Sequence, residues 1–134
     1  MAPRTPNLTE LSILVVDDES IIRNMVEHAL KAISIRSIVL APDGIKALRV
    51  LENTPEPFDI IICDWMMPNM DGMEFLRQVK GRGEPAKFLM LTGKATREAV
   101  SEAISAGIDS YIAKPFTAAE LHKKVKFLAK RIAR

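Results

Sequence analysis

Residues 13–18 have the sequence ILVVDD, in which four apolar residues end in the adjacent carboxylates Asp17 and Asp18. A second run, IIICD at residues 60–64, ends in Asp64 in the same way. An apolar run that ends in an acid is typical of a buried parallel strand whose carboxyl end opens to solvent, and open α/β sheets bind ligands at that edge. If the two strands lie side by side, the three carboxylates converge. Close carboxylates raise one another's proton affinity and favour a hard divalent cation, and oxygen-only ligation favours Mg²⁺ over zinc.

Each of these acids also has a simpler interpretation. Asp17 or Asp18 alone is equally typical of a turn residue or a helix N-cap. Two further strand candidates change the balance, because the run FLML ends in Thr92 and the run SYIA ends in Lys114. Four strand ends would then present an acid pair, an acid, a hydroxyl and a cation, which are the groups that phosphoryl transfer needs.

Strand candidates alternate with helical periodicity along the whole chain. The strands are expected at about residues 12–17, 36–41, 59–64, 87–92 and 109–113. Right-handed crossovers would place the intervening helices on both faces of a parallel sheet. The sequence therefore predicts an α/β fold of the doubly wound, flavodoxin-like (βα)5 type, with a five-stranded parallel sheet of order 2-1-3-4-5. That order puts the first and third strands side by side, where the three acids would meet.

The helical segments carry apolar stripes and recognisable ends. The stripes of the first and last helices are expected at Ile22, Met25, Val26, Ala29 and Ile33, and at Leu121, Val125, Leu128 and Ile132, with Val100, Ala103 and Ile104 on the fourth. Asp71 and Thr117 each stand three residues before a glutamate, which is capping-box spacing, and Gly81 and Gly107 suit positions just after a helix.

Composition limits the class of protein. The chain has 134 residues, enough for one domain, and its 19 Lys and Arg nearly balance its 17 Asp and Glu, so we expect no nucleic acid partner. A single cysteine, Cys63, indicates a core residue in a reducing compartment. We expect no membrane partner and a cytoplasmic location, because no stretch has the length or apolar character of a span or signal peptide. Residues 1–10 are interpreted as a flexible N-terminal arm, and residues 11–134 as the domain.

Four segments resemble the receiver domain of two-component response regulators. They are VDD at 16–18, DWMMPNMDG at 64–72, LTG at 91–93 and YIAKPF at 111–116. The resemblance covers about residues 11–131. The chain looks like a single-domain, CheY-like regulator of a two-component or phosphorelay system, a phosphorylation-operated switch that catalyses its own phosphorylation and dephosphorylation rather than an enzyme.

The resemblance implies a role for each acid. Asp64 would take a phosphoryl group from a phosphohistidine on a histidine kinase or a histidine phosphotransfer protein. Asp18 and Asp64 would bind Mg²⁺ directly, Asp17 through water, and Met66 through its backbone carbonyl.

It also implies how phosphorylation would be sensed. Lys114 and Thr92 would contact the phosphoryl group, and Tyr111 would follow Thr92 as a switch. A cis peptide would join Lys114 to Pro115. The surface of the fourth helix, fifth strand and fifth helix would bind a downstream target, helped by a basic face that contains Lys123, Lys124 and Lys126.

Two positions depart from the family pattern. Met66 replaces a polar amide and Lys94 replaces an acid, both beside the path of the hydrolytic water, so the lifetime of the acyl phosphate stays open. The alternative function is a Mg²⁺-dependent aspartyl-phosphate phosphohydrolase of the haloacid-dehalogenase type. That family usually has an Asp-x-Asp nucleophile on its first strand, whereas this chain has Asp17 followed directly by Asp18.

Overall fold

Five parallel strands form one sheet in the order β2-β1-β3-β4-β5 in the computed structural model, which describes residues 6–132. The strands are β1 (Ser12–Val16), β2 (Ser37–Ala41), β3 (Ile60–Asp64), β4 (Lys87–Thr92) and β5 (Ser110–Ala113). The helices that alternate with them are α1 (Ser20–Ala32), α2 (Gly44–Asn53), α3 (Gly72–Gly81), α4 (Arg97–Ala106) and α5 (Ala118–Ala129). The predicted fold class and strand order are confirmed, and every strand lies within one residue of its expected ends.

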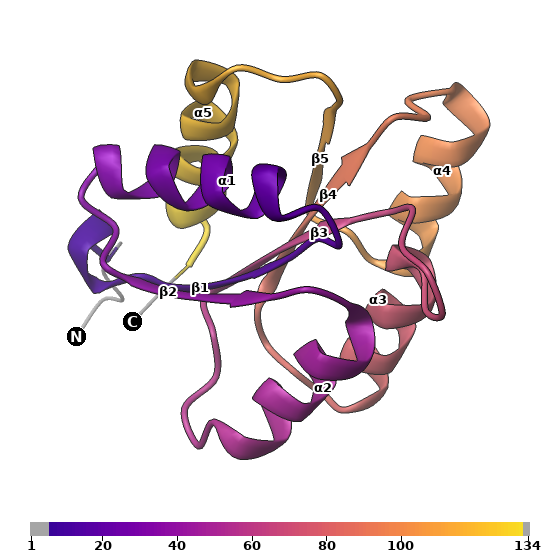
Figure 1. Ribbon diagram of the computed structural model, residues 1–134, viewed down its shortest axis with the longest axis horizontal. Helices are drawn as coiled ribbons and strands as arrows, with labels where there is room; N and C mark the ends of the chain where they lie inside the picture. Colours follow the sequence, from indigo (N-terminus) through magenta and orange to yellow (C-terminus); the bar gives the residue numbers. More distant parts are fainter. Residues whose placement is uncertain (1–5, 133–134) are drawn as a thin grey trace.

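Helices cover both faces of the sheet (Figure 1), so the strands are apolar almost throughout. On β1, Ile13 and Val15 join the apolar cluster beneath α1 and α5. Leu14 and Val16 join the cluster on the opposite face, beneath α2, α3 and α4. This alternation follows from the two-residue period of a strand, and it explains why ILVV contains no polar position.

The strand register brings the functional residues to one edge. Val16 of β1 pairs with Cys63 of β3. Asp17 and Asp64 are the next residues along the chain, so they lie side by side at the ends of neighbouring strands. Asp64 in turn pairs with Leu91, directly before Thr92. The predicted convergence of the strand ends is therefore confirmed.

Three of the four expected helix ends are confirmed. The Thr117 side chain and that of Glu120 form a reciprocal capping box at α5, and the Asp71 side chain accepts from a backbone N–H at the start of α3. Gly107 ends α4 in the left-handed conformation with φ of 111°. The prediction for Gly81 is wrong. Gly81 is the last residue of α3, and the positive φ lies two residues further on.

Two of the expected apolar stripes are wrong in part. On α1, Met25 is exposed, and Leu30 is buried although the expected stripe did not include it. On α4, only Ala103 is buried, whereas Ile104 is 59% exposed. The buried face of α1 is therefore shifted from Met25 toward Leu30, and that of α4 is narrower than its apolar residues define.

The beginning and end of the chain lie partly outside the described residues, which exclude residues 1–5 and 133–134. Within the expected N-terminal arm, Leu8–Glu10 forms a short 3-10 helix, and Leu8 packs against the cluster beneath α1 and α5. Among the described helices, none has both the length and the apolar character needed to cross a membrane.

Candidate functional site

Asp17 is the most buried acid of the site. It follows β1, and its backbone N–H donates to the carbonyl of Ala41 on β2 at 3.2 Å. Its carboxylate is inaccessible to solvent. Oδ1 accepts from the backbone N–H of Glu19 at 2.9 Å, and Oδ2 lies 3.3 Å from Nζ of Lys114. The β1–α1 turn thus holds this carboxylate in place.

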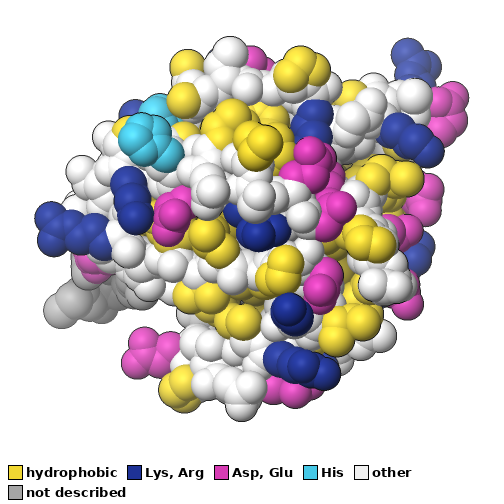
Figure 2. All heavy atoms as spheres, viewed as in Figure 1, with side chains coloured by type: hydrophobic (Ala, Val, Ile, Leu, Met, Phe, Trp, Pro, Cys, Tyr) yellow, Lys and Arg dark blue, Asp and Glu magenta, His cyan; other side chains and the backbone are white. Residues whose placement is uncertain are grey.

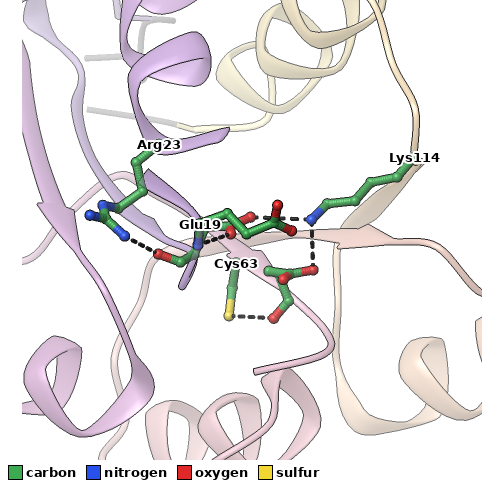
Figure 3. Close-up of polar contacts among 6 residues, drawn as sticks. Glu19, Arg23, Cys63 and Lys114 are labelled. Atoms are coloured by element: carbon green, nitrogen blue, oxygen red, sulfur yellow. Dashed lines mark hydrogen bonds and ion pairs between the residues drawn. The ribbon is translucent and has the colours of Figure 1, made fainter. Parts of the chain in front are cut away.

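Lys114 joins the two strand ends that carry acids. Its Nζ lies 3.0 Å from Oδ1 of Asp64, the last residue of β3, and also contacts Asp17 (Figure 3). The backbone N–H of Lys114 donates to the carbonyl of Thr92 at 2.8 Å, so β4 positions the residue that follows β5. The expected cis peptide between Lys114 and Pro115 is confirmed.

The three predicted carboxylates come together. Asp17, Asp18 and Asp64 each offer one oxygen, and these atoms lie within 4.8 Å of one another. Asp18 is exposed, whereas its two partners are buried. On the face drawn in Figure 2, acidic side chains gather near the loop that follows β1. Three carboxylates with one open side fit a hard cation that keeps several waters, which is how Mg²⁺ is usually bound.

Burial and crowding alter the proton affinity of the nucleophile candidate. Burial and the charges of Asp17 and Asp18 raise the pKa of Asp64 from 3.8 to about 6, although the hydrogen bond from Lys114 opposes the rise. Burial alone would lower the pKa of Lys114, but its contacts with Asp64 and Asp17 outweigh burial and raise it. Burial also raises the pKa of the Cys63 thiol, which makes Cys63 the inert core residue that was expected.

Thr92 lies at the same edge and is buried. Its Oγ1 accepts from the backbone N–H of Lys94 at 2.8 Å, so the hydroxyl proton is free to donate to another acceptor. Lys94 is one of the two departures from the family pattern. Its contact with Thr92 is made by the backbone N–H and therefore does not depend on the lysine side chain.

The start of α3 packs directly on the Asp64 backbone. The backbone N–H of Gly72 donates to the carbonyl of Trp65 at 2.7 Å. A Cβ added at Gly72 would lie 2.4 Å from the carbonyl oxygen of Asp64. Only glycine permits this approach, so Gly72 fixes the helix that lies behind the acid.

Two predicted residues lie outside this polar cluster. The Met66 side chain is 57% exposed, which is compatible with its expected role through the backbone only. Tyr111 is half-buried on β5, where Nζ of Lys124 lies 5.4 Å from the centre of its ring.

Sequence reasoning missed Arg23. Its Nη1 donates to the backbone carbonyl of Asp17 at 2.8 Å. One sequence feature could have indicated it. A cation near the start of a helix is disfavoured by the helix dipole, so its presence there indicates a specific partner.

Comparisons with known proteins agree with this geometry. The family model described as response regulator receiver domain matches residues 13–126. The chain is 37% identical over 124 residues to the chemotaxis protein CheY-3 of Vibrio cholerae. The matched region spans 91% of this chain and 94% of that protein.

Solved structures give the same answer. The receiver domain of the Francisella response regulator 1452 superposes with a TM-score of 0.83 at 30% identity, covering 91% of this chain and 98% of that one. The receiver domain of a sensor histidine kinase from Pseudomonas aeruginosa superposes with a TM-score of 0.76 at 28% identity, covering 89% of this chain and 97% of that one. That structure has a magnesium ion coordinated in its active site cleft. The chain therefore belongs to the response regulator receiver domain family, CheY-like phosphoacceptor modules of two-component signalling.

Proposed function

We propose that the protein is a single-domain response regulator, with residues 11–134 as its receiver domain, that accepts a phosphoryl group on Asp64 from a phosphohistidine. The donor would be a histidine kinase or a histidine phosphotransfer protein. The observation that carries this proposal is the contact of Lys114 with Asp64 at 3.0 Å beside the three converging carboxylates.

Three carboxylates are proposed to hold Mg²⁺, with Asp18 and Asp64 as direct ligands and Asp17 acting through water. The backbone carbonyl of Met66 would complete the protein ligands. When bound, the ion would neutralise charge on the phosphoryl oxygens as they approach the acids.

Transfer requires an ionised nucleophile. The pKa of Asp64, about 6, lies below neutral pH, so its carboxylate is ionised there. An oxygen of Asp64 would form a bond to phosphorus while the phosphorus–nitrogen bond to the donor imidazole breaks, and the imidazole keeps the electron pair. Nζ of Lys114 would then lose its contact with the Asp64 carboxylate and form one with a phosphoryl oxygen.

Thr92 is proposed to sense the product. Its Oγ1 accepts one hydrogen bond, from the Lys94 backbone N–H, which leaves the hydroxyl proton available to donate. A hydrogen bond to the phosphoryl group would draw Thr92 toward Asp64, and Tyr111 would repack in response.

The response is proposed to reach a surface that we call the α4–β5–α5 face, formed by Ile104, Tyr111, Lys123, Lys124 and Phe127. Lys126, which was expected on the same basic face, instead lines a hollow with residues 6–8. Ile104 and Phe127 are 59% and 42% exposed. A hollow of about 520 Å³ runs along α4 as far as Ile104 and Ser105 and is also lined by Tyr111. Exposed apolar groups beside lysines suit a downstream target protein with apolar and acidic side chains.

The test is phosphorylation by acetyl phosphate with Mg²⁺, followed by intact mass. We expect the parent to gain one phosphoryl group and Asp64→Asn to gain none. Asp43→Asn is the matched control, because Asp43 also lies at this edge but caps α2, a role that Asn fulfils equally well.

Two outcomes would count against the proposal. Phosphorylation that persists in Asp64→Asn would misplace the nucleophile. A nucleophile at Asp17 or Asp18 instead would favour the phosphohydrolase alternative, whose nucleophile follows the first strand.

A further inference from the structure

Arg23 holds a backbone group that no step above uses. Its Nη1 donates to the carbonyl oxygen of Asp17 at 2.8 Å, while its own backbone N–H makes the helical bond to Glu19. Figure 3 shows Arg23 and Lys114 approaching from opposite sides. Arg23 and Lys114 therefore both donate to Asp17, Arg23 to its backbone carbonyl and Lys114 to its carboxylate.

The carbonyl that Arg23 holds belongs to the peptide that joins Asp17 to Asp18. Because a peptide group is planar, a hydrogen bond to its oxygen restrains the rotation of the whole unit and so restrains the position of the Asp18 Cα atom relative to Asp17. Asp17 is additionally held by its amide and carboxylate. Asp18 is exposed, so few packing contacts restrain its side chain, and the position of its backbone matters correspondingly more.

The position of Arg23 is costly for the helix. It lies close to the start of α1, where the dipole disfavours a cation, and only the acids that precede the helix, with Glu19 at the N-cap, offset this charge. A hydrogen bond from a charged donor is about twice as strong as one between neutral groups, so the contact with Asp17 compensates for that position.

We propose that Arg23 is a positioning residue for Mg²⁺: it fixes the peptide between Asp17 and Asp18 so that both carboxylates face Asp64. This inference rests on the proposed function, because it needs the metal site. Arg23 touches neither metal nor phosphoryl group, and it acts only through the peptide that it holds.

Charge and geometry predict opposite effects, which makes the inference testable. Replacing Arg23 with a neutral residue removes a positive charge near a cation site, and by Coulomb's law this change alone would strengthen Mg²⁺ binding. Loss of the peptide restraint would weaken it. Weaker binding after neutralisation therefore cannot come from the lost charge.

The experiment is a Mg²⁺ titration of the full chain, followed by Trp65 fluorescence and by calorimetry. Arg23→Met is expected to raise the Kd for Mg²⁺ about tenfold, which is typical when a group that orients metal ligands is lost. Arg23→Lys should recover part of the affinity, because an ammonium can donate one bond to the same carbonyl. Arg49→Met, at an exposed arginine of α2, should stay within about twofold of the parent.

A phosphorylation assay separates orientation from catalysis. With acetyl phosphate at saturating Mg²⁺, Arg23→Met should return to nearly the parental rate, since only the Mg²⁺ requirement changes. A rate that stays low at saturation would contradict a role confined to the metal ligands.

Other outcomes would overturn the inference. Unchanged or tighter Mg²⁺ binding by Arg23→Met would refute it, even if the variant unfolds at a lower temperature in EDTA, because the contact would then be structural only. Equal weakening in Arg49→Met would show that the loss is not specific to the peptide between Asp17 and Asp18, and would contradict the inference. If the parent itself binds no Mg²⁺ while Asp18→Ala behaves identically, the proposed function fails and this inference fails with it.

Discussion

Lys114 is the residue on which the charge balance of the site depends. It contacts Asp17 and Asp64 at 3.3 and 3.0 Å, and both acids are buried. Removing one member of a buried ion pair leaves the others uncompensated, which is more damaging than the net value of the pair suggests. The carboxylates are therefore close enough together to bind a cation. The charge of Lys114 compensates the two buried acids, so that the protein can fold with both of them in its interior.

Asp64→Asn should stabilise the fold in metal-free buffer at neutral pH. The folded protein binds a proton at Asp64 more readily than the unfolded chain does, because the pKa rises from 3.8 to about 6. Stability of the parent therefore falls as pH rises through that window. One pKa unit corresponds to about 1.36 kcal/mol, and weaker amide contact with Lys114 offsets part of the gain, so we expect on the order of 1 to 2 kcal/mol.

Chemical unfolding of both proteins across pH checks this prediction. The advantage of Asp64→Asn should vanish below about pH 4 and be complete above about pH 6. An equal advantage at every pH, or a loss of stability at neutral pH, would contradict it.

Two glycines at opposite ends of α3 should respond with opposite signs to alanine. At Gly72 a Cβ would lie 2.4 Å from the Asp64 carbonyl oxygen, so Gly72→Ala should destabilise by about 1 to 3 kcal/mol through overcrowding. At Gly81 nothing lies within 4 Å, so Gly81→Ala should stabilise by about 0.5 to 1 kcal/mol through lower backbone entropy in the unfolded chain. Denaturant midpoints measure both, and a shared sign would refute the packing argument.

Sequence periodicity predicted where the strands and helices lie better than it predicted which of their apolar residues are exposed. The strands were predictable because apolar runs buried on both faces leave a continuous signal, as in β1 and β3. The α4 pattern was misleading at Ile104 because apolar residues also occur on surfaces, and periodicity does not show which of them the sheet reaches. The site acids were predictable from their strand ends, but Arg23 was not, because its partner is a backbone carbonyl that carries no side-chain signal.

The contact between α1 and α5 contains a further specific bond. Nε2 of His122 lies 2.7 Å from the carbonyl oxygen of Ala29. That carbonyl needs a partner because the backbone N–H of Ile33 donates to Leu30 instead. His122→Ala should therefore destabilise by about 0.5 to 1.5 kcal/mol.

The other histidine is the matched control. His28 is exposed on α1, so His28→Ala should change stability by no more than about 0.5 kcal/mol. Thermal unfolding compares the two variants, and equal effects would show that the bond from His122 contributes nothing specific.

At the scale of the whole molecule, the proposed switch requires that the site be coupled to the α4–β5–α5 face. A hydrogen bond from Thr92 to a charged phosphoryl group is worth about 1.5 to 3 kcal/mol, whereas shifting a 1:99 equilibrium to 99:1 needs about 5.5 kcal/mol. Thr92 cannot complete the switch alone. In the proposed switch, the new contact of Lys114 and inward packing of Tyr111 would contribute, with target binding supplying the remainder.

Thr92→Ala should consequently accept phosphate at Asp64 but lose most of the phosphorylation-dependent affinity for the target. Thr92→Ser, which keeps the hydroxyl, should retain it. Substitutions at Lys123 and Lys124 should weaken target binding without affecting phosphorylation, whereas Lys126, which lies beside residues 6–8, should matter less. Titration of fully phosphorylated proteins with the target measures these effects, and undiminished affinity of Thr92→Ala would show that the coupling runs elsewhere.

The most direct test of the account is to identify the phosphorylated residue. After incubation with acetyl phosphate and Mg²⁺, borohydride reduces an aspartyl phosphate to homoserine, which tandem mass spectrometry locates in the sequence. The account predicts homoserine at position 64 alone, and none when EDTA replaces Mg²⁺. Homoserine at position 17 or 18, or equal labelling in EDTA, would contradict it.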